Sequence, residues 1–243
     1  MKIADELSEI CNRHTLSSLH DVVVPQPYVP FIPKDWNGVL VLAEAQNLSK
    51  ASPDVERLKS ATADERIFRL GRDGRIAIQP WEDGLLKLAV EAALGIQAAQ
   101  TAVSNAVPWS MVDGKGNNKN PTPELINRSK SLWSELLHAL KPEHIVTAGA
   151  IARRVISGAL EKYDDSPLCT AWPLPSPRLF SPISQTIDEV ELMRRFPEVA
   201  KVAGRNPDWV KTRRPNKILF ACLAVASAKG HARKGNARLL TSY

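Results

Sequence analysis

The chain of 243 residues has few of the features that mark secreted, membrane-spanning or disordered proteins. Its three cysteines (Cys11, Cys169 and Cys222) are scattered, and they fit neither a disulfide framework nor a four-thiolate metal site. The longest apolar run, residues 218–228, is too short to cross the roughly 30 Å hydrocarbon core of a bilayer, and no apolar signal region follows Met1. We therefore expect a cytoplasmic protein with no membrane partner.

The composition is that of an ordinary globular chain, with 44% apolar and 24% charged residues. The net charge of +6 is unevenly distributed, because residues 201–243 contain ten Lys and Arg residues against the single acid Asp208. This segment carries +9, so the first 200 residues carry −3. Basic charge gathered in one segment favours a polyanionic partner such as DNA, since phosphate neutralisation releases counterions. A solvated C-terminal helix with charged ends is the alternative.

Short apolar runs alternate with helical patterns along the chain. The runs predict strands at residues 38–43, 101–107, 144–148 and 168–172. Helices are expected at residues 1–20, 82–95, 122–140 and 150–160. This alternation predicts an α/β fold with a mainly parallel sheet, whose functional site would collect in the loops after the strands. Those loops are expected to begin at Glu44, Pro108, Gly149 and Pro173.

The length suits one large domain or two small ones, and we expect a single domain over residues 1–243. It would carry a charged insert at about 48–79 and a basic C-terminal extension at about 186–243. The extension could pack on the sheet or form a separate arm, and a long helix at 215–229, apolar on much of its surface, favours packing.

Five segments near the expected strand ends share one further pattern. They are Val39–Asn47 (VLVLAEAQN), Asn105–Trp109 (NAVPW), Asn118–Glu124 (NKNPTPE), His144–Ala152 (HIVTAGAIA) and Leu174–Arg178 (LPSPR). In this order and strand context they resemble the motifs of the uracil-DNA glycosylase superfamily, over about residues 37–180. The resemblance implies a three-layer α/β/α fold with a central four-stranded sheet. It also implies a monomeric enzyme that flips a base out of DNA and hydrolyses its N-glycosidic bond, leaving an abasic site.

The resemblance assigns the catalytic carboxylate to Glu44. The glycosidic bond breaks through a cationic sugar, so a glycosylase needs a negative group near that sugar. Glu44 would support the cation or orient the attacking water, and Asn47 could position the water instead. The alternative is that Glu44 is a surface glutamate in a loop.

The resemblance places the base among Ala45, Gln46, Trp81 and Asn105. The amide of Asn105 offers a donor and an acceptor, enough for a bidentate contact with a pyrimidine edge. Trp81 would stack on the flipped base. A structural asparagine that caps the loop and a core tryptophan are the alternatives.

The residues predicted to contact DNA are Pro175, Ser176, Pro177, Arg178, Arg213 and Arg214. The proline-rich turn would press against phosphate, and Arg178 would fill the vacated base stack. A proline-rich surface turn is the alternative. We expect monofunctional chemistry, although Lys115 and Lys119 remain open as amine nucleophiles.

The sequence also departs from the family pattern. Leu174 stands where the histidine that stabilises a uracil anion normally lies, which should damage uracil excision. Trp109 stands at a ligand position of the iron–sulfur branch, and we expect no metal and no cofactor. The leading hypothesis is excision of a modified pyrimidine, such as the glucosylated hydroxymethylcytosine of phage DNA that an antiphage member of the superfamily removes. A repair glycosylase for uracil or another deaminated base, and a catalytically inactive DNA-binding module, are the alternatives.

Overall fold

The computed structural model describes residues 3–17, 21–22, 24–46, 78–113, 115, 117, 119–175 and 188–232. The chain divides into two compact units. Unit 1 comprises residues 1–78 and 101–169, and unit 2 comprises residues 79–100 and 170–243. Most of the expected insert at 48–79 lies outside the described residues. The expectation of a single domain stays a prediction.

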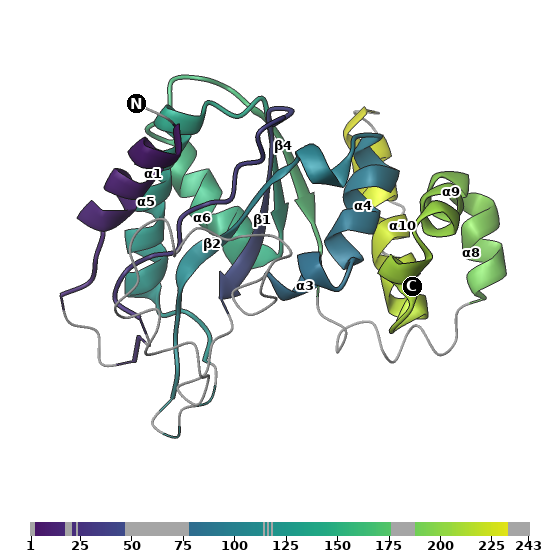
Figure 1. Ribbon diagram of the computed structural model, residues 1–243, viewed down its shortest axis with the longest axis horizontal. Helices are drawn as coiled ribbons and strands as arrows, with labels where there is room; N and C mark the ends of the chain where they lie inside the picture. Colours follow the sequence, from purple (N-terminus) through teal and green to yellow (C-terminus); the bar gives the residue numbers. More distant parts are fainter. Residues whose placement is uncertain are drawn as a thin grey trace. The chain divides into compact units, whose positions relative to one another are not determined.

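Four strands form one sheet in the order β2-β1-β3-β4 (Figure 1). They are β1 (Val39–Gln46), β2 (Ala102–Ser110), β3 (His144–Ala148) and β4 (Leu168–Trp172). On the central strand, Leu40 pairs in parallel with Ala102 of β2 and with Ile145 of β3. The predicted α/β class is confirmed, with an all-parallel four-stranded sheet flanked by helices, consistent with a three-layer α/β/α fold.

Two of the four strand ends differ from the prediction. Loops do begin at Gly149 and Pro173, but β1 continues past Glu44 to Gln46, and β2 continues past Pro108 to Ser110. A shift of register between Ala45 and Gln46 lets the pairing continue. Pro108 is tolerated because β2 is an edge strand, where a missing N–H costs little.

The described part of the proline-rich segment at 21–36 runs beside this edge. The N–H of Tyr28 donates to the carbonyl of Pro108 at 2.9 Å, and Phe31 and Val103 exchange two backbone hydrogen bonds of 3.1 Å. The segment therefore covers much of the edge of β2 that would otherwise be open to another strand.

Unit 1 contains the helices α1 (Ile3–Arg13), α5 (Pro123–Leu140) and α6 (Ala150–Leu160). Helix α5 begins where predicted, since the hydroxyl of Thr122 accepts the N–H of Leu125. Helices α5 and α6 pack on the sheet, and α1 lies beside α5 (Figure 1). Leu40 and Leu42 of β1 belong to the same buried cluster as these helices, and the indole N–H of Trp133 donates to the carbonyl of Ala106 at 2.8 Å.

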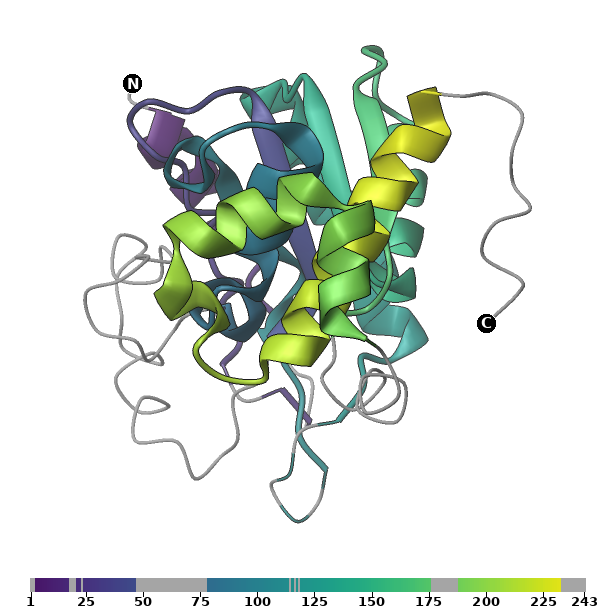
Figure 2. The ribbon, with the colours of Figure 1, turned by 90° about the vertical axis from the view of Figure 1, so that its right-hand side faces the viewer.

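In the described part of unit 2, all the elements other than the last residues of β4 are helices. Its elements are α3 (Gln79–Glu82), α4 (Leu85–Leu94), η2 (Ala98–Gln100), α8 (Glu189–Arg195), α9 (Pro197–Arg205), η3 (Pro207–Val210) and α10 (Arg214–Ala232). Helix α10 packs against α4, and Figure 2 shows α8 and α9 (green) beside α10 (yellow). Ile218, Phe220 and Ala221 of α10 are buried, so this apolar helix packs within unit 2, and packing of the extension on the sheet stays a prediction. No helix in the described part of the chain is long and apolar enough to span a bilayer.

Candidate active site

Glu44 lies near the carboxyl end of β1 and contacts the first turn of α6. Its Oε1 accepts the backbone N–H of Ile151 at 2.8 Å. The first N–H groups of a helix lack partners within the helix and carry partial positive charge, so they stabilise a carboxylate. The Glu44 side chain is half-buried, and among the described residues its second oxygen, Oε2, accepts no hydrogen bond. One oxygen is therefore held by the helix, while the other receives no hydrogen bond from the part of the chain that the structure describes.

Gly149 makes room for this carboxylate. It precedes α6 with φ 108° and ψ 165°, a backbone conformation that is essentially restricted to glycine. A Cβ atom at this position would lie only 2.5 Å from Cγ and from Cδ of Glu44. The sequence places Gly149 at a junction between a strand and a helix, but the contact with Glu44 was not predicted.

Asn105 lies on the neighbouring strand, on the opposite face of the sheet from Glu44. It pairs with Ala43, and paired residues of a parallel sheet share a face while successive residues alternate. Glu44 continues the face of Leu40 and Leu42, which carries α5 and α6. Asn105 is 1% exposed. The sheet thus places the two residues on adjacent strands, but it does not bring their side chains together on one face.

The other predicted residues near the strand ends are only partly described. Ala45 is half-buried and pairs with Val107, and the backbone of Gln46 pairs with Ser110 across the register shift. Leu174 and Pro175 follow β4 and are half-buried. Four predicted residues lie outside the described residues: Asn47, Ser176, Pro177 and Arg178.

Trp81 belongs to unit 2, in the short helix α3. Its side chain is 1% exposed, and its carbonyl accepts the N–H of Gly84 at 3.1 Å. The structure therefore describes Trp81 as a buried tryptophan. A ring in this position has no exposed face on which a base could stack.

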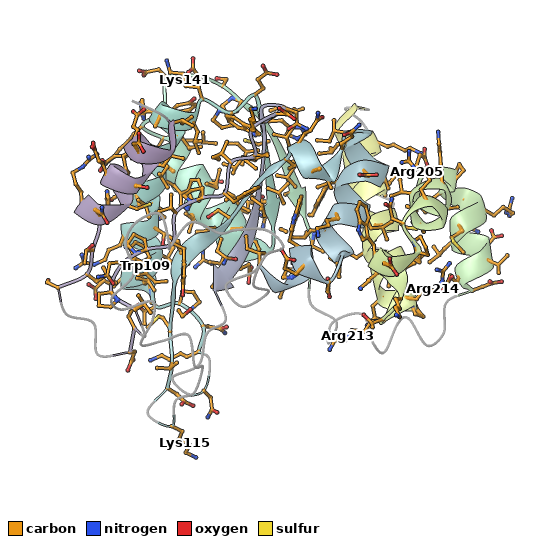
Figure 3. The ribbon with its side chains drawn as sticks, in the orientation of Figure 1. Trp109, Lys115, Lys141, Arg205, Arg213 and Arg214 are labelled. Carbon is orange, nitrogen blue, oxygen red and sulfur yellow. The ribbon has the colours of Figure 1, made fainter. Side chains whose placement is uncertain are left out.

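The exposed and half-buried basic residues of unit 2 include some that are paired with acids and one, Arg213, that is not paired with a described acid. Arg205, Arg214 and Lys229 form ion pairs with Glu91, Glu189 and Glu198, respectively. Arg213 is exposed and makes no ion pair with a described residue, although it is the immediate neighbour of Arg214 at the start of α10 (Figure 3). The sequence predicts the same role for both arginines, but in the structure Arg214 is paired with an acid and Arg213 is not paired with a described one.

Lys217 is a third kind of basic residue, and its environment was not predicted. It is 1% exposed, and its ammonium donates to the carbonyls of Asp83 and Trp209 and to the hydroxyl of Thr212. Burial lowers the pKa of the ammonium. Because its three protons all have acceptors, Lys217 has a structural role.

Of the two lysines that the sequence leaves open as nucleophiles, one is paired with an acid and the other is exposed. The ammonium of Lys119 pairs with Asp21 at 2.5 Å. Lys115 is exposed at the tip of the loop that follows β2 (Figure 3). Its N–H and that of Asn117 both donate to Oδ1 of Asp113, so Asp113 holds this turn in place.

In the described part of the chain, no three His, Cys, Asp or Glu residues are grouped so that they could hold a metal ion. Trp109 is 1% exposed, and its indole N–H donates to the carbonyl of Pro25 at 3.0 Å. A groove of about 480 Å³ lies between α1 and α5, and it is lined by Glu6, Glu9, Ile10, Arg13, Ser134, Glu135, His138 and Ala139. None of these is a predicted site residue, so the groove is separate from the candidate site.

Comparison with known proteins adds no relative. No protein-family model matches the chain, and no curated protein shows significant similarity to it. The resemblance to the uracil-DNA glycosylase superfamily therefore stays a hypothesis that rests on the motifs and their order.

Proposed function

We propose that the protein is a monofunctional DNA glycosylase, which hydrolyses the N-glycosidic bond of a flipped-out base and leaves an abasic site. The observation that supports this most directly is the state of Glu44. It is a half-buried carboxylate near the carboxyl edge of a parallel sheet, with Oε1 held by α6 and no hydrogen bond to Oε2 from any described residue. Open α/β sheets bind their ligands at this edge.

The second oxygen of Glu44, Oε2, could serve two steps of the hydrolysis. As the bond to the base breaks, positive charge develops on the sugar, and Oε2 of Glu44 would stabilise it. The same oxygen would then accept a proton from the attacking water. Since Oε1 is held by the N–H of Ile151, the carboxylate would already be in place when the nucleotide arrives.

The base would be recognised from the other side of the strand end. In this proposal the nucleotide crosses the carboxyl end of β1, with its sugar near Glu44 and its base toward Ala45, on the face of the sheet that also carries the buried Asn105. Because Leu174 replaces the histidine of the family motif, departure of a uracil anion would lack a charged partner. The loss of this histidine counts against uracil, and the resemblance to the antiphage member of the superfamily makes a modified pyrimidine such as glucosylated hydroxymethylcytosine the proposed substrate class. Exposed Arg213 would contribute affinity for phosphate.

The test is abasic-site release, read out by alkaline strand cleavage, from four DNAs. They contain uracil, hydroxymethylcytosine, glucosylated hydroxymethylcytosine or only unmodified bases. Release from the glucosylated DNA alone is the expected result. Glu44→Gln should lower the rate constant by about 100- to 1,000-fold, since one oriented electrostatic group is removed, and should leave DNA binding intact. Release by the Glu44→Gln variant at the wild-type rate would remove Glu44 from the mechanism.

The remaining outcomes select the other candidate functions. Release from uracil DNA would identify a repair enzyme and would show that Leu174 is tolerated. DNA binding without release from any of the four DNAs would overturn the proposal and leave a DNA-binding module.

A further inference from the structure

We infer that Gly149 is a positioning residue, which keeps the carboxylate of Glu44 in its working position against the first turn of α6. This inference rests on the proposed function. Gly149 itself touches no substrate in it. Its role would be to leave the space that the Glu44 side chain occupies and to place the N–H of Ile151 where Oε1 meets it.

Two independent features of Gly149 support this role. The first is its backbone conformation, with φ 108° and ψ 165°, which turns the chain sharply from β3 into α6. The second is the close packing of its Cα against Glu44, where a methyl group would lie 2.5 Å from Cγ and Cδ. Strand β3 is the direct neighbour of β1 in the sheet, so Gly149 at the end of β3 lies next to Glu44 near the end of β1. A side chain at residue 149 would therefore displace the carboxylate.

The test is a cycle of variants that separates strain from contact. Gly149→Ala introduces both a strained backbone and a clash with Glu44. The same substitution in a Glu44→Ala background keeps the strain but removes the Cγ and Cδ atoms that would clash. Gly95→Ala is the matched control, because Gly95 also has a positive φ (70°) but no atom lies within 4 Å of its ideal Cβ position.

The first measurement is thermal stability, which requires no substrate. We expect Gly149→Ala to lower Tm by roughly 4 °C more with Glu44 present than in the Glu44→Ala background, since relief of the clash reduces the loss. Equal losses in the two backgrounds would show that Glu44 and residue 149 are not in contact, and the inference would fail.

The second measurement is single-turnover base release at saturating DNA, on a DNA that the wild type processes. Gly149→Ala should lower the rate constant at least about 100-fold, as expected when a catalytic group moves by about 1 Å. The DNA concentration that gives half of the maximal rate constant should stay within about twofold of the wild-type value, because in the proposed mechanism DNA binding does not depend on Glu44. Gly95→Ala should retain the wild-type rate constant. An unchanged rate constant for Gly149→Ala, with Glu44→Gln inactive, would overturn the inference alone. A wild type that releases no base would instead overturn the proposed function, while the stability cycle would still test the contact.

Discussion

Glu44 of unit 1 and Lys217 of unit 2 are both charged side chains that bond to the backbone, but they differ in how many of their hydrogen-bonding groups are used. In unit 1, Glu44 accepts the N–H of Ile151 at the start of α6 and remains half-buried, and no described residue donates a hydrogen bond to its Oε2. In unit 2, Lys217 is almost completely buried and donates to two carbonyls and a hydroxyl. The acid keeps capacity for a ligand, whereas the base has none.

This contrast separates charges that stabilise the fold from charges available for function. A buried cation requires acceptors for all of its protons, and removal of the cation leaves those acceptors unpaired. A carboxylate at a helix N-terminus is favoured by the partial charge there, yet it can still interact with a substrate through its second oxygen. Lys217 should therefore affect stability, and Glu44 should affect the reaction.

The largest expected effect on stability is that of Lys217→Met. The substitution keeps an unbranched side chain but leaves the carbonyls of Asp83 and Trp209 without the donor that they share. We expect a loss of about 3 kcal/mol in the free energy of unfolding, measured by urea denaturation. Lys229→Met is the matched control on the same helix, because Lys229 is exposed and its contacts, an ion pair with Glu198 and a cation–π contact with the ring of Phe196, lie at the surface. If both variants lose equally little, Lys217 is not the structural cation described above.

Glu44→Gln should change the free energy of unfolding much less than Lys217→Met does. The amide oxygen of a glutamine can still accept the N–H of Ile151, so only the favourable charge at the helix terminus is lost. The expected loss is below about 1 kcal/mol in the same denaturation experiment. A loss as large as that of Lys217→Met would place Glu44 among the structural charges and would weaken its proposed role in catalysis.

Local patterns explain which parts of the structure were predictable. Apolar runs predicted all four strands, Thr122-Pro123 predicted the start of α5, and Gly95 predicted the end of α4 with its positive φ. Helices α8 and α9 were not predicted, although Asp188 caps α8 and Pro197 begins α9. Both signals are local, and closer attention to capping residues could have found these helices.

The contacts of the candidate site were less predictable, because they depend on strand order and long-range packing. A sequence places Glu44 near a strand end, but its contact with α6 requires β3 to be the neighbour of β1. Arg213 and Arg214 are equivalent in sequence, and only the fold brings Glu189 to Arg214. The burial of Trp81 likewise follows from tertiary packing, which no local pattern reports.

Arg213 and Arg214 allow the same comparison, between a charge used within the fold and a charge available to a ligand, on two adjacent residues. Arg213→Ala should weaken binding to every DNA sequence and reduce the slope of log K against log salt by about 0.9, the value for one phosphate contact. Arg214→Ala should leave that slope unchanged, because the Arg214 guanidinium is paired with Glu189 at 2.7 Å. Equal changes of slope would show that DNA competes successfully for Arg214. No change for either variant would remove both residues from the DNA contact.

The smallest effect is expected at Glu135 of unit 1, which is held by side chains near water rather than by the backbone. Burial raises the pKa of Glu135, but hydrogen bonds from Arg13 and His14 outweigh it and hold the pKa below its usual value. Because the pKa is depressed on folding, the carboxylate adds stability above its unfolded pKa of about 4.3, and this stability is lost as pH falls through the lower folded value.

Glu135→Gln measures this contribution. The Glu135 side chain is 43% exposed, so screening by solvent limits the contribution of the pair with Arg13 to about 0.5 kcal/mol at pH 7. In urea denaturation the variant and the wild type should differ at pH 7 and should converge at low pH, once the carboxylate of Glu135 is protonated in the folded state. A difference that persists unchanged at low pH would mean that Glu135 stabilises the junction of α1 and α5 by packing, because a charge effect must vanish when the charge does.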